Sequence, residues 1–155
     1  MTAFFCALSA TGNFFQHFLL LALRLYFGWS FFQAGYHKWL ALDQTASSLA
    51  QLHIPFSLIN TYLVASIESI GGICLIAGFA SRLASIPLTV VLLVALFTQH
   101  VKGAFLIFSN PNAFLAETPV PFLMATLVIF CFGPGWFSLD YLISRFCKKN
   151  ESPKP

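Results

Sequence analysis

Hydrophobic residues dominate four long stretches of the chain, and polar residues gather in the segments between them. The stretches cover about residues 14–36, 58–79, 83–101 and 119–137. A helix needs roughly 20 apolar residues to cross a hydrocarbon core of about 30 Å. The pattern therefore predicts an all-α fold: a polytopic membrane protein with one membrane domain (residues 1–147), built as an antiparallel four-transmembrane-helix bundle. Residues 148–155 are expected to form a flexible tail.

Turn formers and helix caps predict how these stretches are connected. Only Ala80, Ser81 and Arg82 separate the second stretch from the third, so a tight hairpin is expected there. Thr118 and Pro119 predict the start of the fourth helix, because proline is favoured at the first helical position. The glycines on either side of Pro134 indicate where that helix ends.

Two connecting segments and the C-terminal end have further predicted structure. In segment 37–56, Asp43 is expected to cap a short amphipathic helix that ends before Pro55. The segment 102–117 is apolar enough to lie along the membrane interface or to dip back into the bundle. Ser138 is expected to cap a short helix over 139–146 on the membrane surface.

Composition and charge support a membrane protein and exclude a nucleic-acid-binding one. Apolar residues make up 58% of the chain and charged residues 8%, whereas a soluble domain carries about 25% charged residues. The net charge of +3 does not come from a basic stripe within a domain. The four cysteines are scattered, with no Cys/His cluster at metal-binding spacing, so no metal site is expected.

The distribution of Lys and Arg predicts the orientation of the bundle. With four spans, the termini and the predicted hairpin share one side of the membrane. That side carries five of the eight basic residues: Arg82, Arg145, Lys148, Lys149 and Lys154. Because cytoplasmic loops carry an excess of Lys and Arg, both termini are expected in the cytoplasm, with the protein in the bacterial inner membrane.

Arg24 and Glu68 are the charged residues inside the first two stretches. A lone charge at mid-membrane costs about 2.5–3.5 kcal/mol on insertion scales. Each residue lies near the middle of its stretch, so the two are expected to meet at the same depth as an ion pair. Helical spacing also places Gly35 and Gly72 on the faces that carry these charges, where small residues allow close helix contact. The pair is either a buried link between two helices or the polar wall of a ligand or proton cavity.

A second polar group is predicted at the opposite end of the bundle from the hairpin. Tyr36 and Lys38 end the first stretch, and Gln99 and His100 end the third. Such residues are typical interface anchors of transmembrane helices. Alternatively, they form a pocket whose donors bind an anion or the carbonyl groups of a quinone.

Several motifs, taken in order, resemble those of the DoxX family of small four-span membrane proteins. They are Gly35-Tyr36-His37-Lys38 after Arg24, the run from Glu68 through Gly72 and Gly78 to Arg82, and Gly133-Pro134-Gly135 followed by Asp140. The resemblance covers about residues 20–141. It implies a four-helix membrane bundle and importance for the matched positions, with Gly35, Gly72, Gly78, Arg82 and Asp140 interpreted as structural. Arg82 and Asp140 are both expected at the cytoplasmic surface, where a salt bridge between them is predicted to tie the fourth helix to the hairpin.

The family resemblance also implies a function. Some members are membrane subunits of a thiosulfate:quinone oxidoreductase, and others are linked to thiol and oxidative-stress systems. The leading hypothesis is therefore an accessory membrane component of a quinone-linked redox system, which binds quinone and works with a redox partner or as a homo-oligomer. The alternatives are a small proton-coupled transporter of a weak acid or anion, and a non-catalytic assembly subunit.

Overall fold

The computed structural model describes the backbone of residues 2–52, 54–99, 111–133, 135, 138–141, 143 and 145, and all of its regular elements are helices. They are α1 (Thr2–Leu40), α2 (Leu42–Gln51), α3 (Ser57–Ala77), α4 (Ser81–Gln99), α6 (Pro111–Ala116) and α7 (Pro119–Phe132). Within these ranges the side chains of 2–11, 13, 99 and 113 are not described. The predicted all-α fold is confirmed.

Three helices are long and apolar enough to cross a membrane, namely α1 over Phe14–Leu40, α3, and α4 over Ser81–Thr98. The fourth apolar helix, α7, is shorter. Its 14 residues span about 21 Å, and it ends at the first glycine of the predicted break around Pro134, within the span expected over about residues 119–137. Gly133 takes φ 79°, which ends the helix at Phe132. These helices are those of a small polytopic membrane protein.

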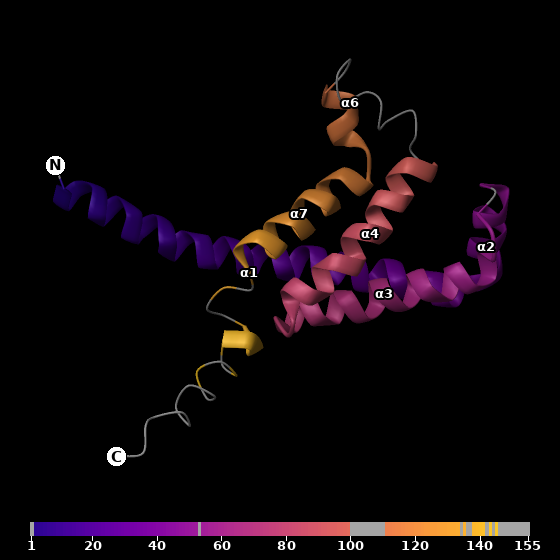
Figure 1. Ribbon diagram of the computed structural model, residues 1–155, viewed down its shortest axis with the longest axis horizontal. Helices are drawn as coiled ribbons and strands as arrows, with labels where there is room; N and C mark the ends of the chain where they lie inside the picture. The colour runs from indigo at the N-terminus through magenta and orange to yellow at the C-terminus, as the bar shows by residue number, and fades with distance from the viewer. Residues whose placement is uncertain are drawn as a thin grey trace.

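The long helices form two antiparallel pairs (Figure 1). Helix α1 lies beside α3, and α4 lies beside α7, which crosses the middle of α1. A shared core joins the pairs, with Phe31 of α1, Leu75 of α3, Leu88 of α4 and Ile129 of α7 all buried. The α3–α4 turn lies at one end of α3, here called the hairpin end. Helix α2 packs at the other, here called the α2 end.

Glycines bring α1 and α3 into backbone contact, as the small-residue faces predicted. A methyl group added at Gly72 would lie 2.6 Å from the backbone nitrogen of Phe32 and 2.7 Å from the carbonyl oxygen of Gly28. One added at Gly35 would lie 2.6 Å from the backbone nitrogen of Ser69. Because only glycine fits at these positions, they fix the separation of the two helices and their register along the axis.

The predicted hairpin between α3 and α4 is confirmed, and it begins at Gly78. Gly78 takes φ 68°, and Gly78 and Phe79 donate backbone hydrogen bonds to Leu75 and Cys74. This is a Schellman motif, in which a left-handed residue ends the helix and satisfies its last carbonyls. Helix α4 then begins at Ser81.

Both predicted short helices are present in the described residues. Helix α2 occupies the segment after α1, although its N-cap residue is Ala41 instead of Asp43, without a side-chain capping bond. Ser138 accepts a hydrogen bond from the backbone nitrogen of Tyr141, which is the predicted N-cap. The apolar segment 102–117 lies largely outside the described residues, and its last part forms α6.

Candidate functional site

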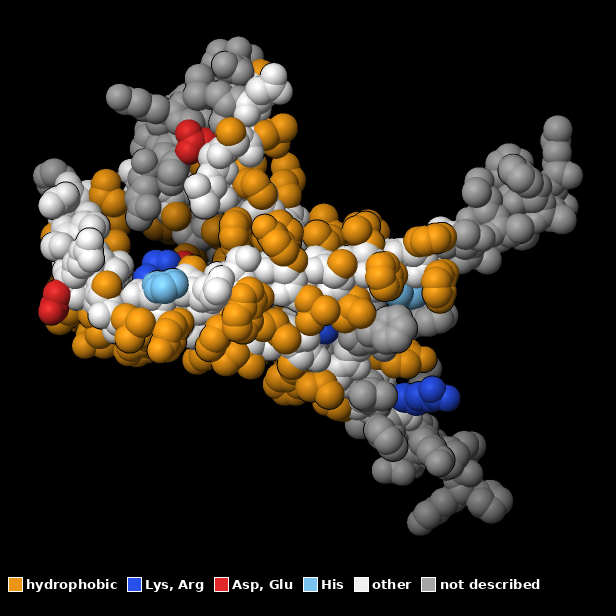
Figure 2. Space-filling view, turned by 180° about the vertical axis from the view of Figure 1, so that it is seen from behind, with side chains coloured by type: hydrophobic (Ala, Val, Ile, Leu, Met, Phe, Trp, Pro, Cys, Tyr) orange, Lys and Arg blue, Asp and Glu red, His pale blue; other side chains and the backbone are white. Residues whose placement is uncertain are grey.

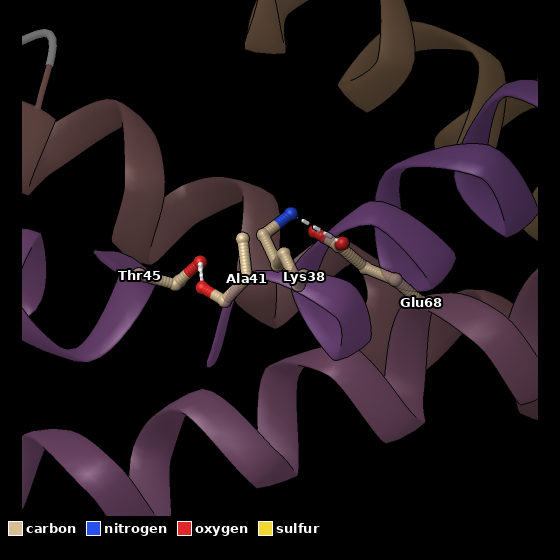
Figure 3. A network of polar contacts seen from close by, with 4 residues as sticks. All are labelled: Lys38, Ala41, Thr45 and Glu68. Carbon is tan, nitrogen blue, oxygen red and sulfur yellow. Dashed lines mark hydrogen bonds and ion pairs between the residues drawn. The ribbon is translucent and has the colours of Figure 1, made fainter. Parts of the chain in front are cut away.

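A partly buried ion pair joins α1 and α3 near the α2 end. Lys38, in the last turn of α1, places its Nζ 2.5 Å from a carboxylate oxygen of Glu68 on α3. The side chain of Glu68 is 9% exposed and that of Lys38 is 29% exposed. Figure 3 shows the two side chains pointing toward one another. A carboxylate removed from water in this way requires a charged partner, and Lys38 supplies it.

A cavity of about 380 Å³ opens beside this ion pair, enclosed by the end of α1, α2, α3 and α4. Its polar wall is made by the charged pair, the amide of Gln44 and four hydroxyl groups, those of Thr45, Ser48, Thr61 and Thr98. Figure 2 shows a basic and an acidic side chain at the edge of a hollow beside α2, on a surface that is otherwise largely apolar. The volume lies within the range of about 300–1,000 Å³ of small-molecule sites.

The hydroxyl groups leave their oxygens available as acceptors. Thr61 donates to the carbonyl oxygen of Ser57 at 2.8 Å, and Thr98 donates to that of Val94 at 2.7 Å. Thr45 donates to the carbonyl oxygen of Ala41 at 2.9 Å. Lys38 has three N–H donors, of which Glu68 takes one. The cavity therefore offers donors at Lys38 and acceptors at the hydroxyls and the carboxylate.

A second, smaller cavity lies on the other side of the ion pair. It measures about 180 Å³ and is lined by Lys38, Glu68 and residues of α4 and α7. Its apolar wall is aromatic: the ring of Phe122 on α7 packs edge-on against that of Phe31, at 5.1 Å between centroids. The charged pair thus lines two cavities and is accessible from both.

The predicted Arg24–Glu68 ion pair is wrong. Arg24 is buried at the hairpin end, where its Nε donates to the carbonyl oxygen of Leu75 at 2.9 Å and its Nη2 to that of Ile76 at 3.3 Å. The glycine contacts set this register, because they place Arg24 against Gly78, about three helical turns beyond Glu68. A cation at the last carbonyls of α3 is favourable, since the C-terminus of a helix carries partial negative charge.

The predicted salt bridge between Arg82 and Asp140 is also replaced by other contacts. Asp140 accepts hydrogen bonds from the backbone nitrogens of Ala80 and Ser81, at 2.7 and 3.2 Å, and so caps the N-terminus of α4. Asp140 also attracts the charge of Arg24. The exposed Arg82 lies against Gly133 instead. Arg24, Gly78 and Asp140 therefore form a structural junction between α1, α3, α4 and the C-terminal segment.

The other predicted donors at the α2 end do not join the described site. Tyr36 is 52% exposed and stacks on Phe32, and it lines neither cavity beside the ion pair. The side chain of Gln99 and all of His100 lie outside the described residues. Sequence reasoning missed the polar face of α2, formed by Gln44, Thr45 and Ser48. The helical spacing of these three residues could have indicated the polar face.

A larger apolar groove of about 630 Å³ lies between α1 and α7, around Phe15, Leu19 and Phe132. Among the described residues that line it, Gln16 has the one polar side chain. A specific ligand requires a few convergent polar groups, so the cavity beside Lys38 and Glu68 is the stronger candidate. Among the described residues, no three His, Cys, Asp or Glu side chains gather closely enough to hold a metal ion.

Comparison with known proteins places this site in a family context. The DoxX family profile matches residues 19–101, which is more than half of the chain and includes both Lys38 and Glu68. The chain belongs to the DoxX family. The matched region runs from α1 through α4 and therefore contains every helix that encloses the cavity.

Two relatives match over most of their length. A Haemophilus influenzae protein named "Uncharacterized protein" is 28% identical over 130 residues, covering 81% of this chain and 83% of the relative. A Bacillus subtilis protein named "Putative oxidoreductase CatD" is 29% identical over 130 residues, covering 84% of this chain and 90% of the relative. No solved structure matches this DoxX chain.

Proposed function

We propose that this DoxX protein is an inner-membrane component of a quinone-linked redox or thiol-stress system, and that it binds the quinone head group in the cavity beside Lys38 and Glu68. The observation that carries the proposal is the accessible Lys38–Glu68 pair in an otherwise apolar protein. Charged residues within transmembrane segments are rare and most often mark ligand or proton pathways. The name of the Bacillus relative, an oxidoreductase, agrees with this class of function.

The chemistry of the cavity suits both redox forms of a quinone. The carbonyl oxygens of an oxidised quinone accept hydrogen bonds, which the free N–H groups of Lys38 supply. The hydroxyl groups of the reduced form donate hydrogen bonds, which the Glu68 carboxylate and the oxygens of Thr61 and Thr98 accept. The aromatic rings in the adjoining smaller cavity offer apolar surface for the ring of the ligand.

The proposal places the cavity near the outer face of the membrane. The hairpin end carries Arg82, and Arg145 follows the helical turn capped by Ser138. By the positive-inside rule this end faces the cytoplasm, so the α2 end faces outward. A partner that exchanges electrons with the bound quinone would then contact the α2 end.

The experiment is a quinone titration of the purified protein in lipid nanodiscs. Lys38→Gln and Glu68→Gln each replace a charged group by a neutral polar amide and are expected to weaken binding by at least tenfold, the equivalent of about 1.4 kcal/mol. Tyr36→Phe, which changes an exposed residue two positions from Lys38, is expected to bind like the wild type. Equal binding by all four proteins would refute the proposal.

The same variants test the two alternative functions. A proton-coupled transporter predicts pH-dependent anion flux in liposomes that disappears in Glu68→Gln. An assembly subunit predicts that the double variant Lys38→Met/Glu68→Leu keeps its cellular function, because a buried ion pair replaced by packed apolar groups is often tolerated. The quinone proposal predicts no flux and loss of function in the folded double variant.

A further inference from the structure

An apolar groove follows the seam between α3 and α4 on the side of α3 away from α1. It consists of two adjoining parts of about 390 and 370 Å³, which share Ile67 and Pro87 as lining residues. The first part begins at the hairpin end beside Phe79 and Leu83. The second continues toward the α2 end along Val90 and Val94.

This groove leads into the polar cavity. The second part shares five lining residues with the cavity beside Lys38 and Glu68: Leu49, Ile54, Val64, Val91 and Val94. Figure 1 shows that α3 and α4 meet at the hairpin and diverge toward the α2 end. The polar cavity and the groove are therefore one continuous depression.

The groove offers mainly apolar surface, which suits hydrocarbon. Its polar side chains are Asn60 and Ser66, which donate to the carbonyl oxygens of Pro55 and Tyr62 within their own chain segment. Helix α4 from Leu83 to Val94 spans roughly 16 Å at about 1.5 Å per residue. That length matches one leaflet, about half of the ~30 Å hydrocarbon core.

We propose that the α3–α4 groove binds the long prenyl tail of the quinone whose head occupies the cavity beside Lys38 and Glu68. The ligand then enters sideways from the bilayer, head group first, and keeps its tail in the seam. This inference rests on the proposed function, since it assigns the tail of that ligand. The groove is continuous with the compact polar cavity and is about as long as one leaflet. These two features are the reason for assigning it a single tail.

The test compares quinones that share one head group and differ in the tail, titrated into nanodiscs with concentrations expressed per lipid. The wild type is expected to bind the long-tailed quinone about five- to tenfold more tightly than the tail-less one. The gain in affinity is modest because the tail leaves apolar lipid for an equally apolar protein groove, so that only better packing favours the bound state. Val90→Trp places a bulky ring in the groove at a lipid-exposed position and is expected to remove that preference. Leu93→Trp, one turn away on the same helix and outside the groove, is the matched control and should keep it.

The outcomes separate this inference from the proposed function. If the wild type binds both quinones equally, or if Val90→Trp and Leu93→Trp behave alike, the tail site is refuted while the head site stands. If neither quinone binds the wild type, the proposed function itself fails. If mass spectrometry shows that long-tailed quinone displaces no phospholipid from the protein, the groove holds ordinary lipid and the inference is wrong. Thermal unfolding of each variant verifies that it is folded.

Discussion

Single residues in this protein place charge where a helix end or an opposite charge compensates it. Arg24 lies at the last carbonyls of α3, Asp140 at the first amides of α4, and Lys38 beside Glu68. The first two contacts match the partial charges of helix ends. The third joins Lys38, in the last turn of α1, to the carboxylate of Glu68 within α3, beside two cavities, which is why its removal has a different expected effect.

Removing Lys38 alone is expected to destabilise the protein. Lys38→Met leaves the buried carboxylate of Glu68 without its cation, which costs about 3–5 kcal/mol for a fully buried pair and about 2 kcal/mol here, because Lys38 is partly exposed. The double variant Lys38→Met/Glu68→Leu should recover most of this loss. Thermal unfolding in detergent measures both. A double variant less stable than the single one would contradict the account.

Asp140 is expected to stabilise the fold through backbone contacts and not through Arg82. Asp140→Ala leaves the first amides of α4 without their acceptor and should lower the free energy of unfolding by about 1–2 kcal/mol, as loss of a helix cap does. Arg82→Ala should change it by less than about 0.5 kcal/mol, as at other surface positions. Equal effects in thermal unfolding would indicate the salt bridge that the sequence suggested.

At the scale of elements, close contact between α1 and α3 positions the ion pair. The two helices approach through Gly28, Gly35 and Gly72, and this register brings Lys38 to Glu68. Helix α2 then covers the opening with its polar face, which makes the cavity. The site therefore depends on glycines about one helical turn from each charged residue, Gly35 before Lys38 on α1 and Gly72 after Glu68 on α3.

Gly72→Ala is expected to separate α1 from α3 and to destabilise the protein by about 1–3 kcal/mol, the usual range for overpacking. The added methyl group meets backbone atoms of α1, which cannot rotate away. Gly12→Ala is the control, because a methyl group there meets nothing within 4 Å and alanine favours a helix. Equal unfolding temperatures for the two variants would show that the backbone contact at Gly72 does not hold α1 against α3.

The sequence predicted which faces of α1 and α3 meet but not their offset along the axis. Hydrophobic periodicity and the spacing of Gly35 and Gly72 identify a face, since they depend on the angle around the helix. The offset was inferred from the assumption that residues 14 and 79 lie at the same membrane depth. Helix α1 begins at Thr2, so this assumption failed, and Arg24 was paired with Glu68 in place of Lys38. The helical spacing of Gln44, Thr45 and Ser48 indicates a polar face on α2, but local periodicity does not show which tertiary contacts that face makes, so its place in the cavity was missed.

At the scale of the whole molecule, the cavity beside Lys38 and Glu68 lies at the α2 end, and the junction formed by Arg24, Gly78 and Asp140 lies at the hairpin end. If the hairpin end faces the cytoplasm as proposed, a cysteine at position 82 reacts only with reagents that cross the membrane. A cysteine at Ser47, exposed on α2, reacts with impermeant reagents added outside intact cells. Labelling in a background without the native cysteines measures this. The reverse pattern would invert the proposed orientation.

The central claim is that the cavity beside Lys38 and Glu68 holds the quinone head, and photoaffinity mapping tests it most directly. A quinone with a photoreactive group on its ring is irradiated with the protein in nanodiscs, and the labelled peptides are identified by mass spectrometry. The account predicts label on α2 near Thr45 and on α3 near Thr61, with loss of that label in Lys38→Gln. Label on Phe15, Leu19 or Phe132 in the larger α1–α7 groove, unchanged in Lys38→Gln, would contradict it.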